Sequence, residues 1–222
     1  QPQVMGAIWQ QIKQAEDNLI NEANAVSDNP LIIPDTKEVI SGGNFHAESV
    51  ALSADQVAIA ACEIGAIAER RIALLTDKAF SGLPAFLVKD AGLNSGFMIA
   101  HVTASALASE NKTHAHPASV DSLPTSANQE DHVSMGTIGA RKARTIIKNS
   151  TNVLAMELLT GLQAVDFRDT TKMSPKTKAI YEYIRKEINF VEDDTIMYKN
   201  IHKIANMINS KEFNKFIDME CD

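Results

Sequence analysis

The chain has 222 residues, of which 45% are hydrophobic and only 5% are aromatic. Alanine, isoleucine and leucine are plentiful, a mixture that suits close-packed helices better than sheets, which favour β-branched and aromatic residues together. The formal net charge of −7 argues against nucleic acid as the main partner, because binding to phosphate groups requires clustered Lys and Arg side chains.

The cysteines and the apolar segments bear on where the protein works. Cys62 and Cys221 provide no disulfide framework, and Cys62 lies in an alanine-rich stretch where we expect a small buried apolar residue. This usage fits a reducing, cytoplasmic setting. No run of about 18 uncharged apolar residues and no basic-then-apolar leader occurs, so we expect neither a membrane span nor a secretion signal. The chain begins at Gln1 without an initiating Met and is helical in pattern almost at once, as expected of a piece of a longer chain.

The first forty residues predict one helix and one hairpin. Apolar residues recur every three or four positions from Val4 and form one face of an amphipathic helix that runs to about Ala25. A dense turn signal, Ser27-Asp28-Asn29-Pro30, follows it. Two short apolar runs, residues 31–33 and 38–40, then flank a Pro-Asp-Thr-Lys turn. They predict a small hairpin and the only β structure of the chain.

The rest of the chain predicts helices separated by an irregular connection and a long loop. The stretches with a helical pattern are residues 49–76, 97–109 and 131–165, and the connecting stretches are residues 77–95 and 111–126. The apolar residues that we expect to be buried along the longest helix are Ile147, Leu154, Leu158, Leu162 and Val165. Ser174 as N-cap and Pro175 at the first helical position then begin a series of two or three short amphipathic helices.

These elements together predict an all-α fold. Small residues such as the alanines of 49–76 let helix axes approach closely, as in the centre of a many-helix bundle. We therefore expect an elongated bundle of long helices, with one small β-hairpin and a tail of short helices. Residues 1–170 would form the central bundle portion, and residues 171–222 the C-terminal segment of short helices.

A run of four different polar side chains, Gln129-Glu130-Asp131-His132, precedes the longest helical pattern. One interpretation is a helix start, in which Asp131 is the N-cap or a first-turn acid. The other interpretation places Glu130 in a cleft, as an acid/base group or as a carboxylate that binds a cation. Spacing alone leaves both open.

Two other places in the sequence carry candidate site residues. Asn44-Phe45-His46 follows two glycines, which predicts either a tight turn with a buried Phe or an aromatic side chain held toward a ligand. His114 and His116 lack a third ligand at a recognisable spacing, so we expect no metal site. The sequence contains no phosphate loop, dinucleotide-binding glycine motif, nucleophile elbow or Cys-x-x-Cys.

The chain resembles the histidine ammonia-lyases, members of the aromatic amino-acid ammonia-lyase family, over nearly its whole length. The segments that carry the resemblance are Gln1-Pro2-Gln3-Val4-Met5-Gly6, Ser27-Asp28-Asn29-Pro30, Ser41-Gly42-Gly43-Asn44-Phe45-His46 and residues 122–136, which contain Asn128-Gln129-Glu130-Asp131-His132. The resemblance implies a fumarase/aspartase-like bundle that is tetrameric in the intact enzyme, although the Ser-Ser-x-Met-Pro loop of the fumarase and aspartase group is absent.

The resemblance also implies an activity, the removal of ammonia from L-histidine to give trans-urocanate. Such enzymes use 4-methylideneimidazol-5-one (MIO), an electrophile formed from an Ala-Ser-Gly tripeptide, and a tyrosine base from another segment. No Ala-Ser-Gly occurs in these 222 residues. We therefore expect the C-terminal portion of such an enzyme, with half of the active site and no lyase activity alone.

Individual residues take their expected roles from the same resemblance. Phe45 matches the aromatic residue beside the electrophile, and Glu130 matches the carboxylate near the substrate imidazole and amine. We expect Gln129 to be a hydrogen-bonding neighbour that binds substrate. Further substrate-binding candidates are Asn44, His46 and His132.

Two alternatives remain. One is a portion of an ammonia-lyase or aminomutase that acts on phenylalanine or tyrosine. Such enzymes usually have Asn-Gln-Asp where this chain has Asn128-Gln129-Glu130, and a carboxylate beside a phenyl ring would be a costly unpaired charge. The other alternative is a non-catalytic helical scaffold or interaction protein. An Ala-Ser-Gly encoded upstream of Gln1 would favour the enzyme, and a start codon at that boundary would favour the scaffold.

Overall fold

The computed structural model describes residues 1–217, so Cys221 lies outside the described residues. Contacts within the chain divide it into two compact units. The first contains Gln1–Ile64 and Asn111–Ile147, and the second contains Gly65–Glu110 and the residues from Lys148 onward. Three long helices contribute to both: α2 (Glu48–Thr76), α4 (Met98–His114) and α5 (Gly136–Asp166). The expectation of a largely helical fold with one hairpin is confirmed for the described residues.

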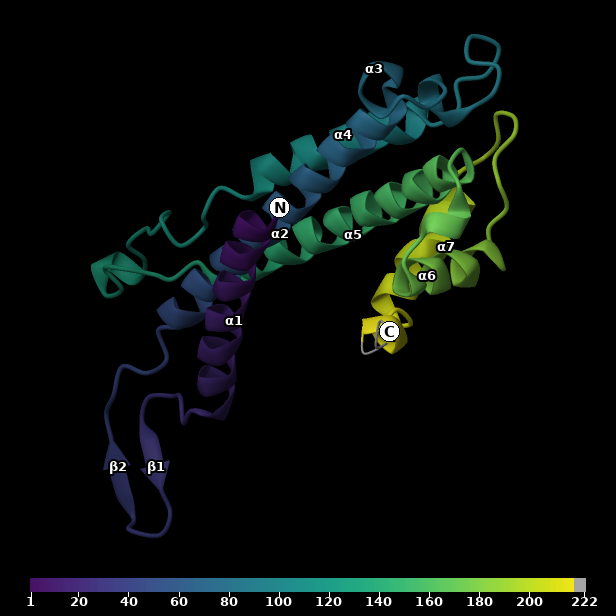
Figure 1. Ribbon diagram of the computed structural model, residues 1–222. Coiled ribbons are helices and arrows are strands. Elements are labelled where there is room, and N and C mark those ends of the chain that lie inside the picture. Colours follow the sequence, from purple (N-terminus) through teal and green to yellow (C-terminus); the bar gives the residue numbers. More distant parts are fainter. Residues whose placement is uncertain (218–222) are drawn as a thin grey trace. The chain divides into compact units, whose positions relative to one another are not determined.

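The first unit begins with α1 (Pro2–Asn24), which buries Ile8 and Ala15. Strands β1 (Leu31–Ile33) and β2 (Glu38–Ile40) follow as an antiparallel pair (Figure 1), with Leu31 opposite Ile40. The helix end and both strands lie where the sequence predicts them. Three small residues and one isoleucine make the buried cluster between α2 and α5 in this unit: Ala58, Cys62, Ala143 and Ile146. Cys62 is buried as expected, and burial raises the pKa of its thiol.

Two predicted boundaries in the first unit are wrong. Helix α4 continues to His114, because Lys112 and His114 in its last turn complement the helix dipole and Pro117 comes only after it. Helix α5 begins at Gly136 rather than at residue 131, because Met135 has a left-handed φ of 54° that a helix cannot contain. Asp131 is therefore not a helix N-cap, and the helix-start interpretation of residues 129–132 is wrong. The short 3-10 turn η2 (Ser126–Asn128) lies in the loop between the two helices.

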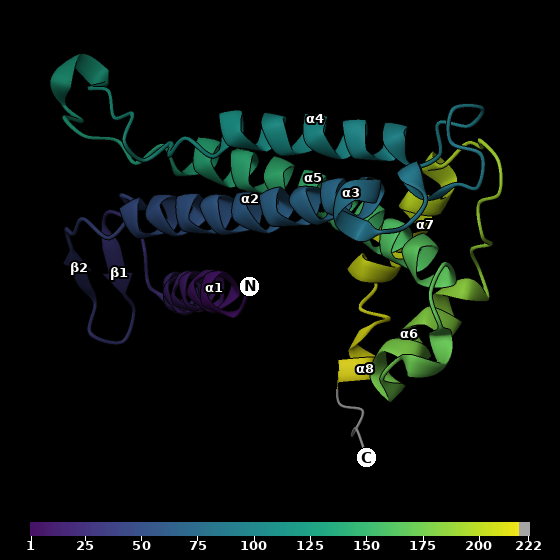
Figure 2. The same ribbon diagram turned by 45° about the horizontal axis from the view of Figure 1, so that its top comes forward.

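The second unit contains the largest apolar core. Its short elements are α3 (Lys78–Ser81), η1 (Ala85–Leu87), η3 (Thr170–Lys172), α6 (Pro175–Arg185), α7 (Tyr198–Asn209) and α8 (Asn214–Ile217), of which α8 lies against α6 (Figure 2). The expected N-cap is confirmed, since Ser174 accepts a hydrogen bond from the Thr177 amide. Phe97, Leu159 and Ile184 are buried together in the core. Leu162 is buried as predicted, whereas Ile147 in the first unit is 46% exposed and its neighbour Ile146 is buried.

Helix α2 bears on the expectation that no segment crosses a membrane. By length and composition alone this helix is apolar enough to do so. Half of its most apolar stretch is buried inside the structure, as in the core helices of many proteins that do not cross a membrane. Helix α2 also carries two buried carboxylates, Asp55 and Glu69. We therefore interpret α2 as a core helix.

Candidate active-site segment

Two segments that the sequence singles out meet in the first unit. The ring of His46 donates a hydrogen bond from Nε2 to the main-chain oxygen of His132 over 2.8 Å, although the two residues are 86 positions apart. The rings of His46 and His132 also lie against each other, with centroids 5.5 Å apart. The loop that contains Asn44 and Phe45 is thereby joined to the loop that contains Gln129 and Glu130.

The backbone that presents Gln129 and Glu130 is strained. Ser126, Ala127 and Asn128 have left-handed φ angles of 49°, 56° and 67°. For residues other than glycine this region costs about 1–2 kcal/mol each, and strain of this kind gathers at functional sites. The turn is closed by the Thr125 amide, which donates to the main-chain oxygen of Glu130 over 2.9 Å. The strained turn, closed by this hydrogen bond, thus fixes the position of the Glu130 backbone.

The side chains of this turn are open to solvent. Both Gln129 and Glu130 are exposed, and Oε2 of Glu130 accepts a 3.3 Å hydrogen bond from the Thr125 hydroxyl. A carboxylate held in this way keeps acceptor capacity for a ligand donor.

Phe45 and Asn44 lie in the turn that follows β2. The side chain of Phe45 is 55% exposed, so the interpretation of a tight turn with a buried Phe is wrong. Asn44 donates from Nδ2 to the main-chain oxygen of Val26 over 3.2 Å, which ties the turn to the segment after α1. The chain thus displays an aromatic ring at its surface and anchors the backbone beside it.

Asp55 is a residue of this region that the sequence analysis missed. This buried carboxylate on α2 accepts hydrogen bonds from the amides of Ala118 over 3.0 Å and Ser119 over 2.8 Å. It anchors the start of the loop that carries Glu130. A single acid within the apolar stretch around it was the available signal, because a buried acid needs partners.

An open hollow of about 760 Å³ lies beside the junction of the two loops. Ala47 and Val50 line one side of it, and residues 133–138 with two cationic side chains, Arg141 and Arg144, line the rest. Both arginines are exposed.

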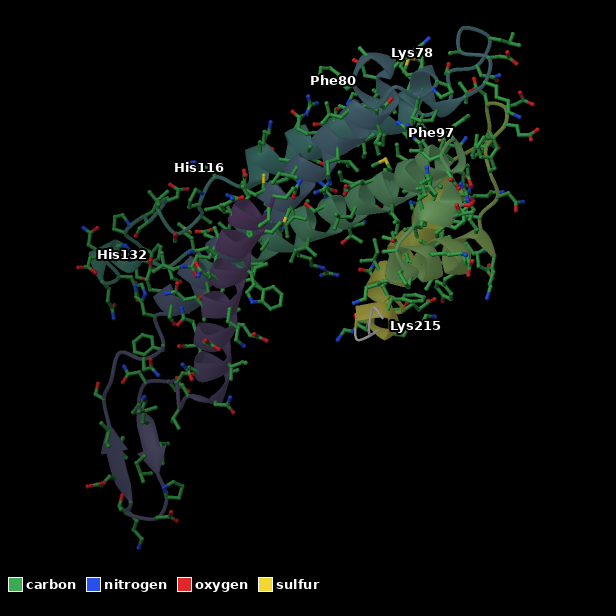
Figure 3. The ribbon with its side chains drawn as sticks, in the orientation of Figure 1. Lys78, Phe80, Phe97, His116, His132 and Lys215 are labelled. Atoms are coloured by element: carbon green, nitrogen blue, oxygen red, sulfur yellow. The ribbon has the colours of Figure 1, made fainter. Side chains whose placement is uncertain are left out.

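The histidines that come together in the structure are not the two that lie close together in the sequence, His114 and His116. His114 ends α4, and His116 lies at the start of the following loop, whereas His132 lies farther along the same loop (Figure 3). Donor atoms of His46, Glu48 and His132 instead lie within 4.8 Å of one another. Glu48 was not among the expected site residues.

Comparison with known proteins sets these features in a family. Residues 1–186 match the model of the family described as aromatic amino acid lyase. The chain belongs to that family. It is 62% identical over 215 residues to the histidine ammonia-lyase of Burkholderia cenocepacia, an alignment that covers 97% of this chain and 42% of that protein. The chain therefore spans about two-fifths of the length of the curated relatives it matches.

Solved structures of this family share the fold. Histidine ammonia-lyase from Trypanosoma cruzi aligns with a TM-score of 0.93 at 44% identity, over 97% of this chain and 43% of that one. Tyrosine aminomutase from Streptomyces globisporus aligns with a TM-score of 0.92 at 38% identity, over all of this chain and 43% of that one. The aromatic amino acid lyase fold is thus common to relatives with different reactions, and substrate choice depends on the residues of the site.

Proposed function

We propose that this chain forms one wall of the active site of an ammonia-lyase that converts L-histidine to trans-urocanate. The observation that carries the proposal is the exposed Glu130 on its strained turn, within a chain that is 62% identical to a histidine ammonia-lyase. A carboxylate suits an imidazole because hydrogen bonds to an ionised group are roughly twice as strong as neutral ones. Histidine breakdown in the cytoplasm would be the setting of this activity.

The residues of the two loops divide the work of binding. Glu130 accepts a hydrogen bond or a proton from the imidazole or the amine of the substrate, and Gln129 offers an amide beside it. Phe45 supplies an aromatic face. Asn44 and His46 position the first loop through their hydrogen bonds to Val26 and His132, and each keeps a further polar atom for substrate. The ring of His132 lies next to that of His46.

The aromatic amino acid lyases depend in general on MIO. This group, when bound, supplies an electrophile that turns the substrate amine into a leaving group. No Ala-Ser-Gly is present in the 222 residues, so the group would come from sequence outside them. Phe45 fits a place beside it, since its ring is exposed and no other described part of the chain covers it fully. We propose that this chain alone does not turn over histidine.

Association with further chains fits the apolar surface. Large apolar side chains are exposed on the helices, among them Trp9 on α1, Ile59 on α2 and Val102 on α4. Exposed apolar side chains in such number favour association. We propose a homo-oligomer, a tetramer in the intact enzyme, in which residues 1–170 contribute the site and residues 171–222 form the short-helix segment.

The test replaces Glu130 in a protein that carries these residues together with an Ala-Ser-Gly segment. We expect Glu130→Gln to lower kcat/KM for histidine at least about tenfold, the lower range of a general acid–base contribution. Urocanate formation is followed by its ultraviolet absorbance, and Asp131→Asn serves as the control because Asp131 is the exposed neighbouring acid. Unchanged kinetics in Glu130→Gln would exclude the assigned role.

An aminomutase or lyase acting on tyrosine is the second candidate, favoured by the structural similarity to the tyrosine aminomutase. The same assay separates the two. Turnover of tyrosine in preference to histidine would replace our proposal with this one, and turnover of neither would favour the non-catalytic scaffold.

A further inference from the structure

The cluster of His46, Glu48 and His132 has the composition of a metal site. Each residue offers one ligand atom, and these atoms all lie within 4.8 Å of one another. Two imidazoles and one carboxylate form a ligand set that suits zinc and similar divalent transition metals, whereas magnesium and calcium prefer sites made of oxygen ligands. The cluster shares His46 and His132 with the proposed substrate site, and a metal would take Nδ1 of His46 in place of substrate. Metal binding is measured without turnover, so its test is independent of lyase activity.

The hydrogen bond of His46 determines which nitrogen is free to bind a metal. Its Nε2 lies 2.8 Å from the main-chain oxygen of His132. A main-chain oxygen can only accept, so Nε2 carries the proton, and the neutral ring has its lone pair on Nδ1. That nitrogen lies 3.9 Å from Oε2 of Glu48. Metal-binding histidines typically donate their other ring N–H to a backbone carbonyl or a carboxylate in this way.

Glu48 presents an oxygen that lacks a hydrogen-bond partner in the described part of the chain. Its Oε2 is buried and makes no hydrogen bond, although the side chain as a whole is 35% exposed. The distance of 3.9 Å to His46 is too long for a hydrogen bond. Glu48 lies in the first turn of α2, where the helix dipole favours a negative charge, but the dipole does not satisfy a buried oxygen. A bound cation explains why this oxygen faces two imidazoles.

The spacing of the donors is close to what zinc requires. Zinc binds imidazole nitrogen and carboxylate oxygen at about 2.0–2.2 Å in a tetrahedron, which places the ligand atoms about 3.3 Å apart. The pair Nδ1 of His46 and Oε2 of Glu48 exceeds that separation by little, at 3.9 Å. All three donor atoms lie within 4.8 Å of one another, so they would move closer by up to about 1.5 Å on binding zinc. His46 and His132 are both exposed, which leaves their side chains room for that movement.

We propose that His46, Glu48 and His132 bind one divalent transition-metal ion, with Zn²⁺ as the ion that the ligand set fits. Three protein ligands leave the fourth tetrahedral position open to water or an external ligand. The bound ion would hold the loop that carries Glu130 against the start of α2, in addition to the His46–His132 hydrogen bond. This proposal departs from the expectation of no metal, which considered His114 and His116 only.

The test is titration of the 222-residue chain, first freed of metal with a chelator, by Zn²⁺ in a calorimeter. We expect one ion per chain, and a rise in the melting temperature because the ion binds the folded state. His46→Ala, His132→Ala and Glu48→Gln should each weaken binding by more than about tenfold, since even residues behind the ligands typically matter that much. His116→Ala is the matched control, an exposed histidine of the same unit outside the cluster.

The remaining outcomes decide against the proposal. Equal loss of affinity in His116→Ala, or wild-type affinity in the three cluster variants, would show binding by scattered surface histidines. Helical content measured by circular dichroism shows whether each variant is folded. If a variant unfolds, X-ray absorption of the zinc-loaded wild-type chain decides instead: two imidazole nitrogens per zinc support the site, and fewer than two overturn it.

Discussion

Asp55 offers a sharp test of how the loop that carries Glu130 is held. Its two carboxylate oxygens accept hydrogen bonds from two successive amides, Oδ1 from Ala118 and Oδ2 from Ser119. All three residues are buried. The bonds fasten the loop to α2 soon after α4 ends. Removal of the carboxylate should therefore loosen the loop.

The magnitude follows from what each substitution leaves behind. Asp55→Ala removes both acceptors and leaves two buried amides without partners, and each hydrogen bond to a charged group contributes about 1.5–3 kcal/mol. We expect a loss of about 3–6 kcal/mol in the free energy of unfolding of the first unit. Asp55→Asn keeps one acceptor oxygen but turns an NH₂ group toward the other amide, so we expect a loss of about 2–3 kcal/mol.

Urea unfolding measures the free energy, and hydrogen exchange followed by mass spectrometry reports on the amides of Ala118 and Ser119. We expect faster exchange at these amides in both variants. Asp121→Asn is the control, an exposed acid of the same loop, and should change the free energy by less than about 0.5 kcal/mol. Wild-type exchange rates at Ala118 and Ser119 in Asp55→Ala would refute the reasoning.

Two further predictions concern buried polar groups of the second unit. Burial alone would raise the pKa of the Glu69 carboxyl, but hydrogen bonds from Arg70, Ser105 and His101 outweigh it and hold the pKa at about 2, below the ordinary 4.5. The stability that this depressed pKa contributes is present above about pH 4.5 and is lost as the pH falls toward 2, by about 3 kcal/mol in total. Between pH 5 and pH 3, the free energy of unfolding measured in urea should therefore fall less in Glu69→Gln than in wild type. Equal losses in the two proteins would contradict this prediction. Gln163 donates hydrogen bonds to the main-chain oxygens of Leu87 and Val191 and accepts one from the Val191 amide. Gln163→Leu should therefore lower the free energy of unfolding by about 3–5 kcal/mol. A loss below about 1 kcal/mol, measured by urea unfolding, would show that these hydrogen bonds do not stabilise the second unit.

The elements that depend on local chemistry could be predicted from the sequence. Helix α1 ends one residue before the predicted position, because a dense turn signal follows it. The hairpin lies on the predicted residues, because its turn interrupts two short apolar runs. Ser174 and Pro175 begin α6 as their capping chemistry requires. In each case residues within a few positions determine the structure.

The misplaced features depend on contacts between distant residues or on backbone angles without a sequence signal. Nothing in the composition of residues 126–128 predicts three successive left-handed residues, of which only Asn commonly adopts that conformation. The start of α5 was misplaced because this turn and Met135 delay it. The contact between His46 and His132 links residues 86 positions apart. Periodicity also failed at Ile147, because an apolar residue at a helical spacing need not face the core of its own chain.

The exposure of Glu130 limits what this chain can do with a histidine ligand. Two unit charges 4 Å apart attract by about 1 kcal/mol in water and by about 4 kcal/mol at an effective dielectric constant of 20, a value that reproduces experiment even for buried sites. On the described residues Glu130 is exposed, so its attraction for an imidazolium lies near the lower figure. The same carboxylate would gain strength and selectivity once other segments cover it and exclude water. Recognition of histidine in our proposal therefore requires both the position of Glu130, which its strained turn supplies, and a covering surface from outside these residues.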